Sequence, residues 1–115
     1  MSTLISTDLS QEKLREILSL LRQGLSTSLG DRLEAVYLYG SRARGDAQPD
    51  SDIDVLVVLR DKFDYFEIIK QTSYLTADLS LEYETVISCV FVTKENYEQR
   101  RTPLLINIRR EGMLV

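Results

Sequence analysis

The pattern of apolar and polar positions first predicts a helix over residues 9–29. Apolar residues recur there at helical spacing, and most of the charged residues fall on the opposite face. The apolar positions are Leu14, Ile17, Leu18, Leu21 and Leu25. Asp8 followed by Gln11 is typical of a helix start, and Gly24 lowers helix propensity without excluding a helix. We therefore expect an amphipathic helix that packs against a core.

Two apolar runs predict buried strands. Residues 34–39 contain five apolar or aromatic residues in succession, and Gly40 follows them. Residues 53–59 form a second run rich in β-branched side chains, and the turn-rich segment 48–51 precedes it. These segments predict a strand, a turn and a second strand.

Between residues 63 and 92 the hydrophobic pattern is first typical of a helix and then of a strand. Residues 63 to about 76 favour a helix, whereas Leu79, Leu81 and Tyr83 alternate as in a strand, so the boundary between them stays open. Residues 85–92 predict a further strand. The pattern as a whole indicates the α/β (α+β) class, and the length suits one domain over residues 1–115.

Two short helices and an edge strand are expected at the C-terminal end. Thr93 is a typical cap for a helix up to Arg100, and Thr102 followed by Pro103 resembles another helix start. Arg109 and Arg110 then fall in the last helical turn and Gly112 follows it, which is the usual order at a helix end. Residues 113–115 are expected to add an edge strand.

Composition narrows the classes of function. The chain has a net charge of −4, which argues against binding nucleic acid mainly through phosphate attraction. It has no histidine, which excludes Ser-His and Cys-His catalysis. The single cysteine, Cys89, is interpreted as a buried apolar filler. No apolar segment reaches the roughly 18 residues that span a bilayer, and no signal pattern precedes the first helix, so we expect a cytoplasmic protein without a membrane partner.

A pair of carboxylates marks the start of the second strand. Because side chains alternate along a strand, Asp52 and Asp54 project to the same side, roughly 7 Å apart. Two acids at this spacing repel each other, and a divalent cation relieves the repulsion. Magnesium prefers hard oxygen ligands and commonly takes one or two carboxylates. The pair is therefore a candidate magnesium site, although taken alone it also fits the solvated face of an edge strand.

The turn after the first strand is a candidate phosphate site. Gly40 lets the backbone approach a ligand closely, and Ser41 offers a hydroxyl and an N–H group where a short helix is expected. Arg42 and Arg44 suit contacts with a polyphosphate. A Gly-Ser dipeptide alone is more often an ordinary turn, but together with the aspartate pair it favours a site for nucleotidyl transfer.

These residues resemble a known family. Gly40-Ser41, ten intervening residues and Asp52-Ile53-Asp54 resemble the signature of the DNA polymerase beta nucleotidyltransferase superfamily. The segment GSRARGDAQPDSDIDV is similar to its minimal nucleotidyltransferase branch, as are the size of the chain, the helix before the motif and the ending INIRREGMLV. That branch includes MNT antitoxins, which pair with HEPN ribonuclease toxins. The resemblance implies a minimal nucleotidyltransferase fold, a small mixed sheet with flanking helices.

The resemblance also implies a reaction. The two aspartates would hold Mg²⁺, with two ions expected, and the Gly-Ser turn would hold the phosphates of ATP. A hydroxyl then attacks the α-phosphate and pyrophosphate leaves. In the antitoxin branch the hydroxyl belongs to a tyrosine of the HEPN partner, and the transferred AMP silences the ribonuclease.

One departure from the family pattern concerns a third carboxylate. The superfamily usually has this acid on a neighbouring strand, where it helps to bind metal and to activate the nucleophile. The predicted strand 85–92 contains no acid, and the nearest candidates are Glu82 and Glu84 just before it. We assign Glu84 as the candidate, on the alternating face that includes Val86. Either the acid is displaced or the enzyme is impaired.

Two alternatives to the adenylylating antitoxin stay open. In one, the catalytic centre is degenerate and the protein neutralises the toxin by masking its surface. In the other, the protein transfers a nucleotide to a small molecule or to RNA. The small size and the acidic balance argue against the latter, because little chain is left to build a separate acceptor pocket.

Overall fold

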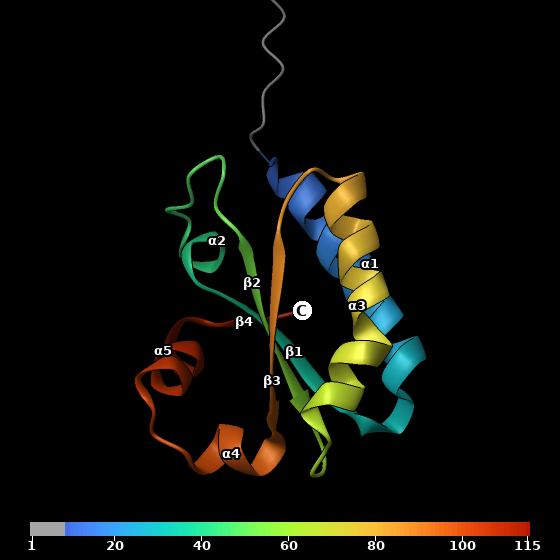
Figure 1. The fold of residues 1–115 in the computed structure, drawn as a ribbon. Coiled ribbons are helices and arrows are strands. Elements are labelled where there is room, and N and C mark those ends of the chain that lie inside the picture. Colours follow the sequence, from blue (N-terminus) through green and yellow to red (C-terminus); the bar gives the residue numbers. More distant parts are fainter. Residues whose placement is uncertain (1–8) are drawn as a thin grey trace, which may run out of the picture.

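A computed structural model describes residues 9–115. Its helices and strands follow one another in the order that Figure 1 shows. They are α1 (Gln11–Leu29), a 3-10 turn (Gly30–Arg32), β1 (Leu33–Tyr39), α2 (Ser41–Arg44), β2 (Ile53–Leu59), α3 (Tyr65–Glu82), β3 (Ile87–Thr93), α4 (Lys94–Gln99), α5 (Pro103–Glu111) and β4 (Met113–Leu114).

The strands form one mixed sheet of four strands in the order β3-β2-β1-β4. β1 runs antiparallel to both β2 and β4, whereas β2 and β3 run parallel. β2 is buried almost throughout because it has a neighbour on each side and helices on both faces. The expected small mixed sheet with flanking helices is confirmed, as is the edge strand near the C-terminal end.

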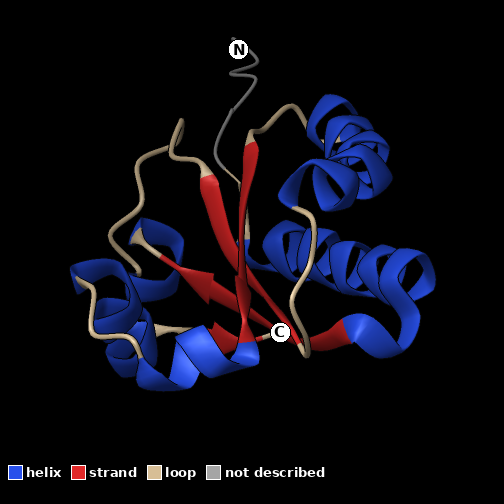
Figure 2. Cartoon of the chain, turned by 60° about the horizontal axis from the view of Figure 1, so that its bottom comes forward, coloured by secondary structure: helices blue, strands red, loops and turns tan. Residues whose placement is uncertain are grey.

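Helices cover both faces of the sheet. α1 and α3 lie on one face, and α4 and α5 lie on the other (Figures 1 and 2). The larger core cluster joins α1 and α3 to residues such as Val55 and Val57 of β2, and the smaller one joins α5 to Leu56 and Val58. Successive residues of β2 therefore serve opposite cores, as the alternation of side chains along a strand requires.

The first helix agrees with its prediction. The apolar positions Leu14, Ile17, Leu21 and Leu25 are all buried. The Ser10 hydroxyl caps the helix by accepting a hydrogen bond from the Lys13 amide at 3.0 Å. The cap predicted at Asp8 lies outside the described residues.

The strand pattern predicted at Leu79, Leu81 and Tyr83 is wrong. α3 continues to Glu82, with Asp64 as its N-cap. Leu79 is buried against the core, whereas Leu81 is 80% exposed on the opposite side of the helix. Apolar residues on both faces of a helix weaken the 3.6-residue period and can imitate the alternation of a strand.

The elements that follow agree closely with expectation. β3 begins two residues later than predicted, at Ile87 rather than residue 85, and extends to Thr93. The hydroxyls of Thr93 and Thr102 cap α4 and α5, and Gly112 ends α5. Cys89 packs against the larger core cluster, where burial raises the pKa of its thiol to about 12, as suits a structural filler. Among residues 9–115 no helix is both long and apolar enough to cross a membrane.

Candidate functional site

β1, α2 and β2 bring the Gly-Ser turn against the aspartate pair. Gly40 ends β1 with a φ of 74°, a conformation that residues with a side chain rarely adopt. A Cβ atom added at Gly40 would lie 2.5 Å from Oδ2 of Asp54. The carboxylate of Asp54 therefore occupies the space that a side chain at Gly40 would need. The structure places the predicted phosphate turn and the predicted metal ligand side by side.

A single helical turn follows Gly40. α2 begins at Ser41, as expected, and the amides of Ala43 and Arg44 both donate to the Gly40 carbonyl at 3.1 Å. Gly45 ends α2 with a φ of 87° and donates its amide to the Ser41 carbonyl at 2.9 Å. This tight turn holds Ser41 directly beside Gly40 at the end of β1.

The two aspartates differ in their environment. Asp54 is the second residue of β2 and is half-buried, whereas Asp52 precedes the strand and is exposed. Burial, and then the charge of Asp52, raise the pKa of the Asp54 carboxyl above its ordinary value, while Arg44 opposes the shift. Two adjacent carboxylates that repel each other form an environment that a cation stabilises.

The aspartate pair fits a magnesium ion. Mg²⁺ binds oxygen ligands and usually retains water and substrate phosphates beside one or two protein carboxylates. Asp52 and Asp54 supply two such carboxylates, and the absence of a side chain at Gly40 leaves Oδ2 of Asp54 unobstructed on that side. Within residues 9–115 no cluster of three or more acidic or thiol side chains is placed to hold a metal ion. The donor set therefore fits an ion that completes its coordination with water and a nucleotide.

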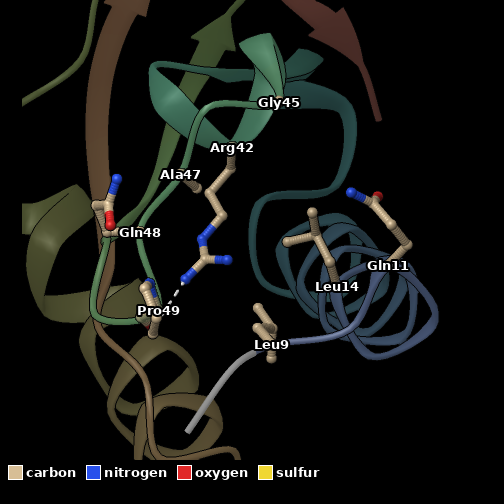
Figure 3. Close-up of a pocket in the computed structure, with 8 residues that line it drawn as sticks. All are labelled: Leu9, Gln11, Leu14, Arg42, Gly45, Ala47, Gln48 and Pro49. Atoms are coloured by element: carbon tan, nitrogen blue, oxygen red, sulfur yellow. Dashed lines mark hydrogen bonds between the residues drawn. The ribbon is translucent and has the colours of Figure 1, made fainter.

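The two predicted arginines have different surroundings. Nη2 of Arg42 donates to the carbonyl of Ser51 at 2.9 Å and to that of Pro49 at 3.3 Å, the contact drawn in Figure 3. Its Nε is buried and has no hydrogen-bond partner within residues 9–115. Because the Ser51 carbonyl belongs to the peptide bond that leads into Asp52, Arg42 fixes the segment that positions this aspartate.

A cavity of about 350 Å³ adjoins Arg42 on the side of α1. Figure 3 shows Arg42 extending from α2 towards Pro49, with Leu9 and Leu14 across the cavity. The lining residues are Leu9, Gln11, Leu14, Arg42, Gly45, Ala47, Gln48 and Pro49. Because neither aspartate lines this cavity, we do not assign it to the triphosphate.

Arg44 lies on the side of the carboxylates. Its guanidinium pairs with Asp46 at 3.2 Å and with Glu111 at 3.7 Å, and it is close enough to Asp54 to lower the pKa of that carboxyl. The partners are substantially exposed, so these ion pairs contribute little to stability. Arg44 can therefore exchange these two ion pairs for contacts with an anionic ligand with little loss of stability.

The sheet register identifies the position next to Asp54. In the parallel pairing of β2 with β3, Asp54 lies opposite Ser88, so no acid of β3 stands beside it. Glu82 is the last residue of α3, and Glu84 is an exposed loop residue with a φ of 51°. The strand alternation used to place these two glutamates was therefore wrong.

Sequence reasoning missed Tyr39 and Ser88 as neighbours of the site. Tyr39 is opposite Asp54 in the antiparallel pairing of β1 with β2, and burial, followed by the charge of Asp54, raises the pKa of its hydroxyl. Both neighbours follow from strand register, and no local motif in the sequence identifies the register.

Comparison with known proteins agrees with this geometry. The model of the nucleotidyltransferase domain family matches residues 13–111. The chain belongs to this family. It is also similar to a proposed protein adenylyltransferase of Methanocaldococcus jannaschii, MJ0141, with 37% identity over 82 residues, which cover 69% of this chain and 79% of the relative. The protein is accordingly a nucleotidyltransferase.

Solved structures share the fold. A proposed nucleotidyltransferase from Sulfolobus solfataricus matches with a TM-score of 0.64 and 21% identity, covering 99% of this chain and 89% of its own. The complex of an MNT antitoxin with the tri-AMPylated HEPN toxin of Shewanella oneidensis contains a chain that matches with a TM-score of 0.51 and 21% identity, covering 87% of this chain and 66% of its own. At this identity the likeness shows a common fold.

Proposed function

We propose that the protein is an antitoxin that transfers AMP from ATP to a tyrosine of a HEPN ribonuclease toxin. The observation that carries the proposal is the contact between the Gly40 backbone and the Asp54 carboxylate, which sets a phosphate turn beside a metal ligand. The similar MJ0141 is a proposed protein adenylyltransferase, and the toxin in the Shewanella complex is AMPylated. We place the reaction in the cytoplasm, where ATP and the RNA substrates of a ribonuclease are found.

Each residue of the site has a proposed task. The backbone at Gly40 and Ser41 receives the phosphates, and Arg44 neutralises part of their charge. Asp52 and Asp54 hold Mg²⁺, with two ions expected. Bound magnesium supplies positive charge that stabilises both the attacking and the leaving oxygen. Arg42 keeps the loop before Asp52 in place, and we retain direct phosphate contact by Arg42 as the alternative that a substitution tests.

The transfer exchanges one phosphorus–oxygen bond for another. The tyrosine oxygen of the toxin forms a bond to the α-phosphorus, and the bond from this phosphorus to the bridging oxygen of the β-phosphate breaks, so that pyrophosphate leaves. The phenolic proton passes to a base or to water. Glu84 is our candidate base, because among the acids outside the aspartate pair it lies nearest in sequence to the start of β3.

The proposal is tested by incubating the protein with a HEPN-family ribonuclease from the same organism, ATP and Mg²⁺. We expect a mass gain of one or more AMP groups on a tyrosine of the partner and loss of its ribonuclease activity. Asp52→Asn should abolish the mass gain. Asp31→Asn, which changes the charge equally at an exposed turn away from the site, should not. If the wild type produces no AMP adduct under these conditions, the transferase proposal fails.

Neutralisation by binding alone is the second candidate, and one observation favours it. Ser88 stands in register with Asp54 where an acid would complete the site. In that case Asp52→Asn would silence the toxin as well as the wild type does, and no AMP adduct would form. The same incubation therefore separates the two functions.

A further inference from the structure

α5 brings an acid to the face of the sheet on which Asp54 lies. Leu56 and Val58 of β2 pack against Ile108 of α5. Because alternate residues of a strand share a face, the Asp54 side chain is on the side that α5 covers. Glu111, the last residue of α5, follows Ile108 by three positions, a spacing that makes neighbours on a helix surface. Figure 1 shows α5 next to α2, the helix that follows the phosphate turn.

An acid at the end of α5 is not what helix stability favours. The C-terminal end of a helix has a partial negative charge, so Arg109 and Arg110 suit the last turn whereas Glu111 does not. A nearby cation offsets the repulsion, and Arg44 of α2 supplies one, with its Nη1 3.7 Å from Oε2 of Glu111. The acid is therefore matched to a residue of the candidate site rather than to its own helix.

The contacts of Arg44 leave one arrangement for a forked contact with phosphate. Its Nε donates to Oδ2 of Asp46 at 3.2 Å, which occupies the fork formed by Nε and Nη2. The other fork is formed by Nη1 and Nη2, and Glu111 pairs with Nη1. A phosphate that binds this second fork therefore takes Nη1 from Glu111.

We propose that Glu111 sets the affinity for ATP by competing with its phosphates for Arg44. The proposal rests on the proposed function for the role of Arg44 as a phosphate contact. Without nucleotide, Glu111 neutralises part of the charge of Arg44, and when ATP binds, Arg44 exchanges this carboxylate for a phosphate. The Glu111 side chain is 35% exposed, so the ion pair is weak enough to be exchanged.

The free energy of releasing Arg44 is spent on binding and not in the chemical step. Arg44 contacts phosphate both in the complex with ATP and in the transition state, so the loss of its pair with Glu111 affects both equally. Removing Glu111 should therefore lower the KM for ATP and leave kcat within about twofold. A residue needed only for the fold of α5 would not lower the KM.

The first test is a double-substitution cycle on ATP binding by the isolated protein. Calorimetry with ATP and Mg²⁺ gives the affinity of the wild type, of Glu111→Gln, of Arg44→Gln and of the variant with both substitutions. We expect Glu111→Gln to bind ATP about threefold more tightly, or about 0.7 kcal/mol, the size of an exposed ion pair. Arg44→Gln should bind more weakly, and adding Glu111→Gln to it should no longer tighten binding.

Glu98→Gln is the matched control. Glu98 is an exposed acid of α4, which follows Thr93. Thr93 pairs with Leu59 at the far end of β2 from Asp54. The substitution removes the same charge at a distance from the site, so the affinity for ATP should not change.

Hydrogen exchange at Gly112 provides a second measurement that does not depend on catalysis. The Gly112 amide donates to the Ile108 carbonyl at 2.7 Å and closes α5. When ATP takes Arg44, Glu111 is left without its cation at the negative end of the helix. This amide should therefore exchange about twofold faster with ATP and Mg²⁺ than without them. In Glu111→Gln the nucleotide should not change the rate.

The outcomes separate this competition from AMP transfer. If the protein binds ATP with these changes in affinity but adds no AMP to the HEPN protein, the proposed function fails and the competition is supported. The competition is overturned if Glu111→Gln binds ATP no more tightly than the wild type. It is also overturned if Glu111→Gln tightens binding equally in the Arg44→Gln background, since repulsion between Glu111 and the phosphates would then explain the gain. An exchange rate at Gly112 that ATP leaves unchanged in the wild type would overturn it as well.

Discussion

Residues 33–59 and residues 65–93 supply neighbouring strands to one sheet, but they differ in the residues that they place at the candidate site. The first segment brings the Gly40 turn and both aspartates within a short stretch of chain. The second places Ser88 beside Asp54 and exposes apolar side chains along α3. The comparison teaches that the candidate phosphate turn and metal ligands come from one short stretch of chain, whereas the residue beside them in the sheet is set by strand register.

The largest expected loss of activity follows substitution of Asp54 in the first segment, and a smaller loss is expected for Glu84 in the second. Asp54→Asn should lower kcat/KM by about 10³-fold, or about 4 kcal/mol, because the variant loses a carboxylate that holds the metal. Glu84→Gln should lower kcat by about 10²-fold, at the lower end of the loss expected for a general base. Initial rates of AMP transfer measure both. Equal losses would mean that Glu84 belongs to the metal site and would break the distinction between the segments.

A smaller effect is expected from Gly40. Gly40→Ala places a Cβ atom 2.5 Å from Oδ2 of Asp54 and should displace that carboxylate, costing about 10²-fold in kcat/KM. Gly45→Ala is the matched control, because its φ is also positive but nothing lies within 4 Å of the added atom. Both variants should lose about 1–2 kcal/mol of stability from the left-handed backbone. If they lose activity equally, strain rather than the contact with Asp54 explains the loss.

Substitutions of Arg42 and Arg44 distinguish a residue that positions the metal ligand from one that binds phosphate in the first segment. Arg42→Gln removes hydrogen bonds to the carbonyls of Pro49 and Ser51 and should weaken metal affinity about tenfold through Asp52. Arg44→Gln should instead raise the KM for ATP. Direct Mn²⁺ binding without nucleotide, measured by electron paramagnetic resonance, distinguishes these effects. An unchanged metal affinity in Arg42→Gln, with a raised KM for ATP, would make Arg42 a phosphate ligand.

The smallest effect concerns stability and pH. The raised pKa of Asp54 means that the folded protein favours its protonated form, so this contribution to stability is complete below the ordinary value of 3.8 and is lost as pH rises through the raised pKa. Asp54→Asn should therefore unfold at higher urea concentration than the wild type at pH 7, and the difference should vanish in acid. Mg²⁺ should stabilise the wild type more than the variant. A variant less stable than the wild type at pH 7 would contradict this sign.

Most of the first segment could be predicted from sequence because its determinants are local. The turn at Gly40, the short helix from Ser41 and the strand from Ile53 to Leu59 all lie where the residues indicate. α1 was equally clear, because its two faces differ in polarity. α3 was misinterpreted beyond its first turns, since Leu81 and Leu79 lie on opposite faces and both are apolar.

The sequence by itself determined which groups this nucleotidyltransferase offers, namely a glycine-serine turn, two carboxylates one residue apart and capped helices, because each depends on a few adjacent residues. Only the tertiary structure decided that Oδ2 of Asp54 fills the space at Gly40, that Ser88 stands beside that aspartate, and that one side of α3 is exposed. The physical reason is that strand register and helix burial depend on packing between segments distant in the chain, and no local pattern encodes that packing.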